Sequence, residues 1–409
     1  MKPCVEALKS NLVFQHHKFR TLPKNKRCGN FIFRTFCFLR LRCDLIFHME
    51  KTVGIGIIGT GFARKVQIPA FLQCANARIV SVASGRRENA ENVAKEFDIA
   101  HFTGNWRETV EREDVDLVCI TTPPNLHREM TLFALEHDKH ILCEKPMAMN
   151  AGEAVEMMEK AEEKNVLALI DHELRFQNGR QRAFEILRGS DIGKIIHAKY
   201  NFRNASRGDV NLPWNWWSDE TQGGGALGAI GSHVIDSFRW FLGTEISSVF
   251  CQLQTRVKER KDAGSGEIRS VTSDDESNMI LRFASGDLTE DATGIASISM
   301  VERPKYENTI EFFGTTGALR VGFKGEIFLA KENENDWREV EVEFDKPLEV
   351  VADTGFSRGF TSFAPKIIEA IQTGKTEIEY AATFADGLKV QEVLDAAHKS
   401  NESGCAVKI

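Results

Sequence analysis

A lysine and a histidine are the residues of this chain best suited to moving a proton. Lys145 lies in Cys143-Glu144-Lys145-Pro146, and His233 follows 88 residues later in Gly231-Ser232-His233. A lysine accepts a proton when burial or a nearby positive charge lowers its pKa toward neutrality, and a histidine can bind or polarise an oxygen atom. Either motif alone is typical of an ordinary turn or helix start. Their order, after a glycine turn, indicates a proton-transfer site.

The glycine turn Gly59-Thr60-Gly61 follows the apolar run Val53–Ile58 and precedes a stretch with helical spacing. Glycines permit a tight turn and let a pyrophosphate approach the backbone, while the free N–H groups of the helix start attract the anion. The usual third glycine position is Arg64, so this dinucleotide-binding fingerprint is incomplete. A plain strand–helix turn is the alternative. We expect four residues of the turn to contact the cofactor: Gly59, Gly61, Phe62 and Ala63.

The end of the next predicted strand bears on the choice of cofactor. It reads Ala83-Ser84-Gly85-Arg86-Arg87, with no acid for the ribose hydroxyls of NAD. A small residue followed by arginines suits the 2′-phosphate of NADP, which a guanidinium can grip with two hydrogen bonds. The sequence therefore favours NADP(H) over NAD(H), bound by Ser84, Arg86 and Arg87. The alternative is that both arginines are solvated residues at a helix start.

A third group of candidate cofactor contacts follows the buried run Asp116–Thr122. In open α/β sheets, ligands bind beyond the carboxyl ends of the strands, although the two prolines here could equally form only a loop. We assign Thr122, Pro123, Asn125 and His127 to the cofactor site, together with Glu144 and Lys145. For His127, a position in a loop or helix cap is favoured over catalysis.

Two regions that differ in their order of strands and helices must position these residues. From Val53 to Ile170, short strands alternate with helices, which predicts a doubly wound parallel sheet, that is, a Rossmann domain. After about residue 171, many β-prone runs follow without long helices between them, which predicts an open, mostly antiparallel sheet flanked by helices. The stretch Lys258–Ser277 is charged and rich in glycine and serine, and we expect it to be an exposed loop.

The predicted domains are residues 49–170 for the dinucleotide and 171–409 for substrate and oligomerisation. Residues 1–48 hold ten Lys/Arg and only two Asp/Glu. We expect this basic extension to be disordered or absent from the native protein, with Met49 as the natural start. A targeting or membrane-surface segment is the alternative.

Composition excludes several classes of protein. Without the basic extension, the rest of the chain has a net charge of −15. This acidic balance argues against a nucleic-acid partner. Nine cysteines include no Cys-x-x-Cys pair, as in a reduced, cytoplasmic protein. We expect no membrane span. His172 and Glu173 are sequence neighbours that need not face one ion, so we expect no metal site.

Taken together, the motifs resemble the glucose–fructose oxidoreductase/inositol dehydrogenase (Gfo/Idh/MocA) family. The resemblance rests on the glycine turn, on Thr122-Pro123-Pro124-Asn125-Leu126-His127, on Glu144-Lys145-Pro146 and on Gly231-Ser232-His233. It implies NAD(P)-dependent oxidation or reduction of a sugar, cyclitol or related small polyol. It also implies homodimers or homotetramers packed through the second sheet. Lys145 would be the catalytic lysine and His233 the substrate-binding or acid/base histidine.

One position departs from the family pattern. An aspartate commonly lies four residues before the histidine, where this chain has Ala229, and residues four apart share a helix face. Proton transfer would then rest on Lys145, with His233 polarising the substrate oxygen. The alternative is a non-catalytic dinucleotide-binding sensor or scaffold. For the substrate we expect contacts from Arg175, Asp236 and Trp216, although Arg175 could instead be paired structurally and tryptophans near residue 216 could pack between domains.

Overall fold

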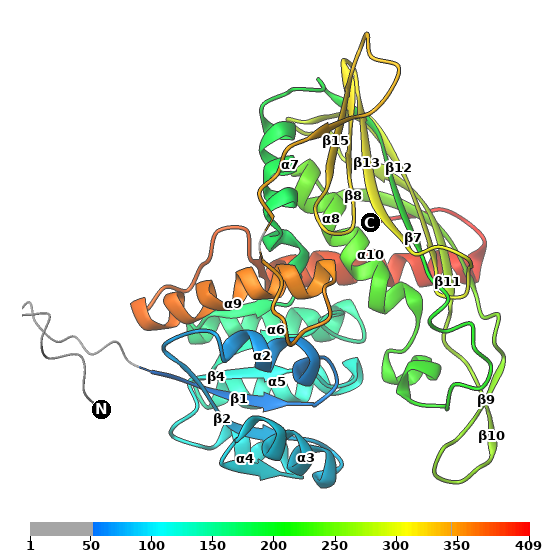
Figure 1. Ribbon diagram of the computed structural model, residues 1–409. Helices are drawn as coiled ribbons and strands as arrows, with labels where there is room; N and C mark the ends of the chain where they lie inside the picture. Colours follow the sequence, from blue (N-terminus) through cyan, green and yellow to red (C-terminus); the bar gives the residue numbers. More distant parts are fainter. Residues whose placement is uncertain (1–51, 345) are drawn as a thin grey trace, which may run out of the picture. The chain divides into compact units, whose positions relative to one another are not determined.

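The computed structural model describes residues 52–344 and 346–409, and the predicted basic extension lies outside them (Figure 1). The first sheet has the strand order β17-β6-β5-β4-β1-β2-β3. Its strands are β1 (Val53–Ile58), β2 (Ala77–Ala83), β3 (His101–Thr103), β4 (Leu117–Ile120), β5 (His140–Cys143), β6 (Ala168–Ile170) and β17 (Ala382–Thr383). All neighbouring pairs are parallel except β17 with β6. The strand order reverses between β1 and β4, which is where such sheets bind a dinucleotide.

Alternation along the buried strands gives the first sheet two apolar faces. Val53, Ile55 and Ile57 belong to one core and Ile58 to the other. The first core is shared with α2 (Ile68–Phe71), α3 (Arg87–Phe97) and α9 (Gly355–Thr373). The second is shared with α4 (Trp106–Val110), α5 (His127–Glu136) and α6 (Ala151–Lys164). Asn105 and Asn150 cap α4 and α6. The predicted Rossmann arrangement is confirmed.

The second sheet has the order β16-β15-β14-β13-β7-β12-β11-β8-β18 and is antiparallel except between β7 and β12. Its inner face packs on α7 (Asn178–Arg188), α8 (Ser232–Leu242) and α10 (Phe384–Ser403). Its strands are β7 (Ile195–Arg203), β8 (Ile246–Gln254), β11 (Glu276–Phe283), β12 (Thr289–Ser299), β13 (Glu307–Gly314), β14 (Gly317–Val321), β15 (Ile327–Lys331), β16 (Arg338–Val340) and β18 (Val407–Lys408). The predicted open, mostly antiparallel sheet is also confirmed.

The stretch predicted as an exposed loop is partly ordered into a hairpin. Within Lys258–Ser277 lie β9 (Glu259–Lys261) and β10 (Ile268–Ser270), which pair antiparallel. Arg260 is buried there because its guanidinium donates hydrogen bonds to the backbone carbonyls of Arg207 and Asp209. The prediction of a fully exposed loop is therefore wrong: composition indicated the solvated turn at residues 262–266 but not these tertiary contacts.

The end of the chain returns to the first sheet. The two-residue strand β17 pairs with β6, and Phe360 and Phe363 of α9 lie in the core beside β1. The ring of Phe363 stacks on Phe176 with their centroids 4.0 Å apart. Residues after 354 were assigned to the second domain by the predicted division at residue 170. They nevertheless complete the dinucleotide sheet and its core. Over residues 52–344 and 346–409, no helix is long and apolar enough to cross a membrane.

Candidate functional site

The turn after β1 is shaped for a phosphate group. Gly59 has φ +101°, and a Cβ there would lie 2.4 Å from the carbonyl oxygen of Thr121, so glycine is required. Thr121 Oγ1 fixes the turn by donating a hydrogen bond to Gly59 O at 2.9 Å. Gly61 is exposed, and a Cβ there would meet no atom within 4 Å. No side chain caps the following helix η1 (Ala63–Gln67), so its first N–H groups remain available to an anion.

The predicted cofactor residues of the second strand lie at the carboxyl end of β2. Ser84 is half-buried, and Arg86 and Arg87 are exposed. The Arg87 guanidinium lies over the Phe102 ring, 4.7 Å from its centroid, and 4.0 Å from a Glu91 carboxylate oxygen. Within the described residues, the Arg86 guanidinium forms neither a hydrogen bond nor an ion pair, and only the backbone carbonyl of Arg86 is engaged, by Asn89 N. Of the two arginines, Arg86 is the one whose guanidinium is not already engaged.

His127 joins the two loops that flank the site. Its ring is buried at the start of α5 and lies 3.0 Å from each of two carbonyl oxygens, those of Thr122 and Pro146. A neutral imidazole has one N–H and can donate to only one of them, and burial lowers the pKa of His127. The loop with Pro123 and Asn125 is thus held against the residue that follows Lys145. This geometry makes His127 a positioning residue.

Lys145 bridges the two domains. Its Nζ donates a hydrogen bond to the backbone carbonyl of Ala229 at 3.2 Å and lies 4.0 Å from Glu144 Oε2. Ala229 lies in the short helix η6 (Leu227–Gly231) that leads into α8. Position 229 therefore does face the lysine, but through a carbonyl oxygen rather than a carboxylate. The Lys145 amino group has a neutral acceptor on that side.

Three carboxyl groups are buried on the β-sheet side of Lys145. They are Glu144 after β5 and Asp171 and Glu173 after β6. Gln67 Nε2 joins two of them, lying 2.7 Å from Asp171 Oδ2 and 3.5 Å from Glu144 Oε1. Asp171 Oδ1 and Glu173 Oε2 are buried without a hydrogen-bond partner among the described residues. Burial first, and then repulsion from neighbouring carboxylates, raises the pKa of both Asp171 and Glu173, and burial raises the pKa of Glu144.

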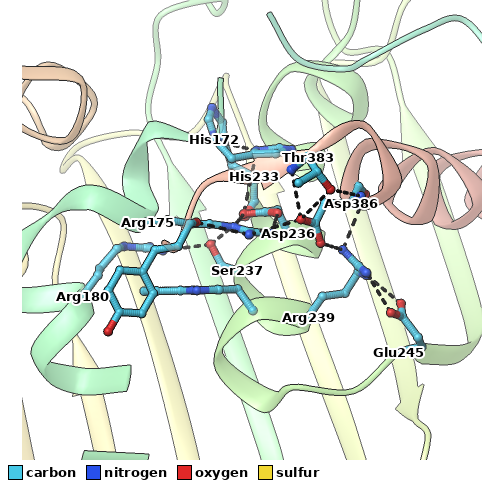
Figure 2. Close-up of polar contacts among 12 residues, drawn as sticks. His172, Arg175, Arg180, His233, Asp236, Ser237, Arg239, Glu245, Thr383 and Asp386 are labelled. Carbon is cyan, nitrogen blue, oxygen red and sulfur yellow. Dashed lines mark hydrogen bonds and ion pairs between the residues drawn. The ribbon is translucent and has the colours of Figure 1, made fainter. Parts of the chain in front are cut away.

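His233 is paired with a second histidine that was considered only as a metal ligand. His172 Nδ1 and His233 Nδ1 are 3.5 Å apart, and the two rings meet edge to face (Figure 2). Burial, opposed by nearby Asp236, lowers the pKa of His172 to about 4, and burial together with Lys145 lowers the pKa of His233 strongly. Both rings are therefore neutral at pH 7, so His233 can donate one hydrogen bond without adding charge.

The charged residues expected to contact substrate are engaged with each other. Arg175 Nε donates to Asp236 Oδ2 at 2.9 Å, and Arg175 Nη2 contacts Asp236 Oδ1 (Figure 2). Asp386 on α10 lies near both Arg175 and Arg239, and Arg239 also binds Glu245. This buried network joins η3 (Glu173–Phe176) to α8 and α10. The geometry favours a structural pairing of Arg175, and substrate contacts by Arg175 and Asp236 stay predictions.

Trp216 lies in the short helix η4 (Trp216–Ser218), beside Trp217 at a ring-centroid distance of 5.3 Å. Trp217 packs on the core of the second sheet. Within the described part of the chain, no ring contact or hydrogen bond joins Trp216 to Lys145 or His233. The same residues include no group of three or more His, Cys, Asp or Glu side chains suited to a metal ion.

The raised pKa of Asp171 predicts how stability depends on pH. The unfolded chain releases this proton above about pH 4, whereas the folded protein retains it to higher pH, so folding loses stability as pH rises through the folded-state pKa. Between about pH 5 and pH 8, we expect the free energy of unfolding to fall less for Asp171→Asn than for wild type. The two falls should differ by about 1 kcal/mol or more. Urea unfolding at several pH values measures this. Asp395→Asn, at a carboxylate bound to Ala151 N, should follow wild type.

This chain is similar in sequence and in structure to several known proteins. Levoglucosan dehydrogenase of Pseudarthrobacter phenanthrenivorans is 29% identical over 387 residues, covering 86% of this chain and 96% of that protein. Human glucose-fructose oxidoreductase domain-containing protein 2 is 25% identical, covering 87% and 93%. The structure of levoglucosan dehydrogenase with NADH and levoglucosan superposes with a TM-score of 0.77 at 26% identity, covering 87% and 99%. An oxidoreductase domain protein from Kribbella flavida gives 0.78 at 26%, covering 88% and 99%.

Two family models match in the order expected from the fold. Residues 53–172 match the oxidoreductase family with an NAD-binding Rossmann fold, and residues 180–320 match the GFO/IDH/MocA C-terminal domain. The first match ends at His172 and so contains the glycine turn and Lys145, while the second contains Ala229 and His233. The chain is a nicotinamide-dependent dehydrogenase that belongs to the Gfo/Idh/MocA oxidoreductase family.

Proposed function

We propose that this chain transfers a hydride between NADP(H) and a secondary alcohol or ketone carbon of a sugar, cyclitol or related small polyol. Residues 49–170 bind the dinucleotide and residues 171–409 bind the substrate. The observation that carries the proposal is the position of Lys145. Its amino group lies at the carboxyl edge of the Rossmann sheet, in contact with the segment that leads to His233.

In the oxidation direction, Lys145 accepts the proton of the substrate hydroxyl while the O–H bond breaks and the carbonyl forms. A nicotinamide held by the glycine turn and the ends of β2 and β4 would supply the hydride acceptor for the same carbon. His233, neutral at pH 7, donates a hydrogen bond to the oxygen and stabilises the charge that develops there. Glu144 lies 4.0 Å from Lys145 Nζ and would hold the lysine or bind the ribose hydroxyls.

The substrate class follows from chemistry and from relatives. A lysine and a histidine recognise a hydroxyl by hydrogen bonding, and a polyol offers further hydroxyls to the polar lining. One relative is named levoglucosan dehydrogenase, and its structures contain NADH with levoglucosan or L-sorbose. These names support a sugar-like substrate for this chain.

Replacing the lysine tests the mechanism. We expect Lys145→Ala to lower kcat by about 10²–10⁴-fold, the usual contribution of a positioned acid or base, with little change in cofactor affinity. A panel of sugars, cyclitols and diols, followed by the absorbance of reduced nicotinamide, measures turnover. Lys194→Ala, at a lysine that binds Asp287 O far from this site in the sequence, is the control. Full turnover by Lys145→Ala would contradict the mechanism.

Tight cofactor binding by wild type without turnover on the panel would support the sensor alternative, which Ala229 favours.

The preference for NADP(H) is supported by Ser84 and by the free guanidinium of Arg86 at the end of β2. A hydrogen bond to a charged group contributes about 1.5–3 kcal/mol. We therefore expect Arg86→Ala to raise the KM for NADP by about tenfold or more while changing the KM for NAD little. Arg78→Ala, at the opposite end of β2 and near Asp114, is the matched control. A clear preference of wild type for NAD would overturn the assignment.

We also propose that the chain forms a homodimer or homotetramer through the outer face of the second sheet. Phe250, Ile280 and Ile295 lie opposite one another on β8, β11 and β12, with exposed fractions of 38%, 58% and 44%. Such a contiguous apolar row is typical of an interface.

A charge placed in this row should separate the subunits. We expect Ile280→Glu to sediment as a smaller species than wild type in analytical ultracentrifugation, because an unpaired carboxylate would be buried at the interface. Ile268→Glu is the matched control, since Ile268 is 63% exposed but lies on the β9–β10 hairpin. An unchanged sedimentation coefficient for Ile280→Glu would place the interface elsewhere.

A further inference from the structure

A row of aromatic rings leads from the candidate catalytic histidine to the protein surface. The His233 ring lies 5.2 Å from Phe356, Phe356 lies 5.7 Å from Phe323, and Phe323 lies 4.7 Å from Tyr306, measured between ring centroids. Phe356 lies in the first turn of α9, Phe323 follows β14, and Tyr306 precedes β13. Segments distant in the sequence thus contribute one ring each. The row ends at Tyr306, which is 40% exposed.

The outer two rings border a cavity of about 510 Å³. This volume lies within the range of small-molecule sites, which is about 300–1,000 Å³. Besides Tyr306 and Phe323, the lining includes hydrogen-bonding side chains, among them Arg203, Glu302, Asn308 and Glu326. Arg203 is held between two carboxylates, with its Nε 3.4 Å from Glu302 and 3.8 Å from Glu307. Aromatic faces beside carboxylates, an amide and a guanidinium suit a sugar ring, which has apolar C–H faces and hydroxyls at its edge.

Phe356 connects this cavity to the cofactor side. Besides its contacts with His233 and Phe323, it lines a second cavity of about 720 Å³ together with Phe62, the residue that follows the glycine turn. A substrate whose reacting carbon lies at His233 would have Phe356 beside it, and Phe356 in turn contacts Phe323 of the outer cavity lining. Three successive ring-to-ring contacts thus link His233 to Tyr306 through Phe356 and Phe323.

We propose that Tyr306 and Phe323 form a second subsite that binds the ring adjoining the reacting ring. The preferred substrate is then a glycoside or disaccharide rather than a free monosaccharide. The reacting ring lies at Lys145 and His233, so this inference rests on the proposed function. In the subsite, the Tyr306 ring stacks on the adjoining sugar, and the polar lining accepts and donates hydrogen bonds to its hydroxyls.

Paired substrates that share one reacting ring test the subsite. Glucose, maltose, cellobiose and the 4-nitrophenyl glucosides serve as probes, both in turnover with NADP and in calorimetric binding to the NADP-loaded protein. We expect wild type to favour at least one two-ring probe over glucose by about tenfold or more in kcat/KM or in affinity, as expected when a desolvated aromatic contact is gained. Tyr306→Ala should lose that preference and keep its glucose values, whereas Tyr306→Phe should retain the preference.

Trp337→Ala is the matched control, because Trp337 is an aromatic residue that stacks under the Arg320 guanidinium and does not line this cavity. Equal values for one-ring and two-ring probes in wild type would overturn the subsite, and so would a preference that survives Tyr306→Ala or is lost in Trp337→Ala. Failure of the proposed function has a different signature: two-ring probes would bind in a Tyr306-dependent way, but no probe would be turned over.

Discussion

Burial of charge between the two domains is the constraint on which the site depends. Arg175 and Asp236 are both almost fully buried, and each supplies the opposite charge that the other requires. Removing one partner of such a pair leaves an uncompensated charge, which costs about 3–5 kcal/mol. Arg175 lies in η3, the short helix that follows β6, and Asp236 lies about one helical turn after His233. The pair therefore fixes the distance between His172 and His233, and with it the direction in which His233 presents its ring.

The same constraint governs the surroundings of Lys145. Buried carboxyl groups without hydrogen-bond donors favour protonation. Glu144, Asp171 and Glu173 lie on the sheet side of Lys145, and burial, with mutual repulsion for Asp171 and Glu173, raises their pKa values. The carboxyl group that position 229 lacks on the helix side thus has counterparts on the sheet side. Loss of an aspartate at 229 leaves a lysine with acidic neighbours, not an isolated one.

Much of this arrangement could be predicted from local sequence patterns. The strand β1 has the predicted bounds, because an apolar run that ends in a glycine turn is a local signal. The glycine turn and Lys145 were found for the same reason. Asp171 and His172 could have been proposed as site residues, since they follow a buried strand as Thr122 does.

Other features depend on contacts between distant segments and carry no local signal. The central strand β7 was not predicted, although its pairing with β12 and β13 holds the second sheet together. Nothing near Phe356 indicates that its ring reaches His233. Gln67 is a polar residue in a helical pattern, and its link to Asp171 spans 104 positions. The pairing of Arg175 with Asp236 likewise requires the two domains to be assembled first.

The return of the chain to the first sheet has a consequence for biosynthesis. The cofactor sheet is finished by β17, and its core is covered by α9, both encoded in the last part of the chain. On the ribosome, residues 52–170 therefore emerge with an unpaired sheet edge at β6 and an apolar face beside β1 that α2 and α3 cover only in part. N-terminal domains usually fold as units during synthesis, but this one has to wait for the C-terminal helices. Translation must be nearly finished before the nucleotide site reaches its final form, and chaperones have an exposed surface to bind until then.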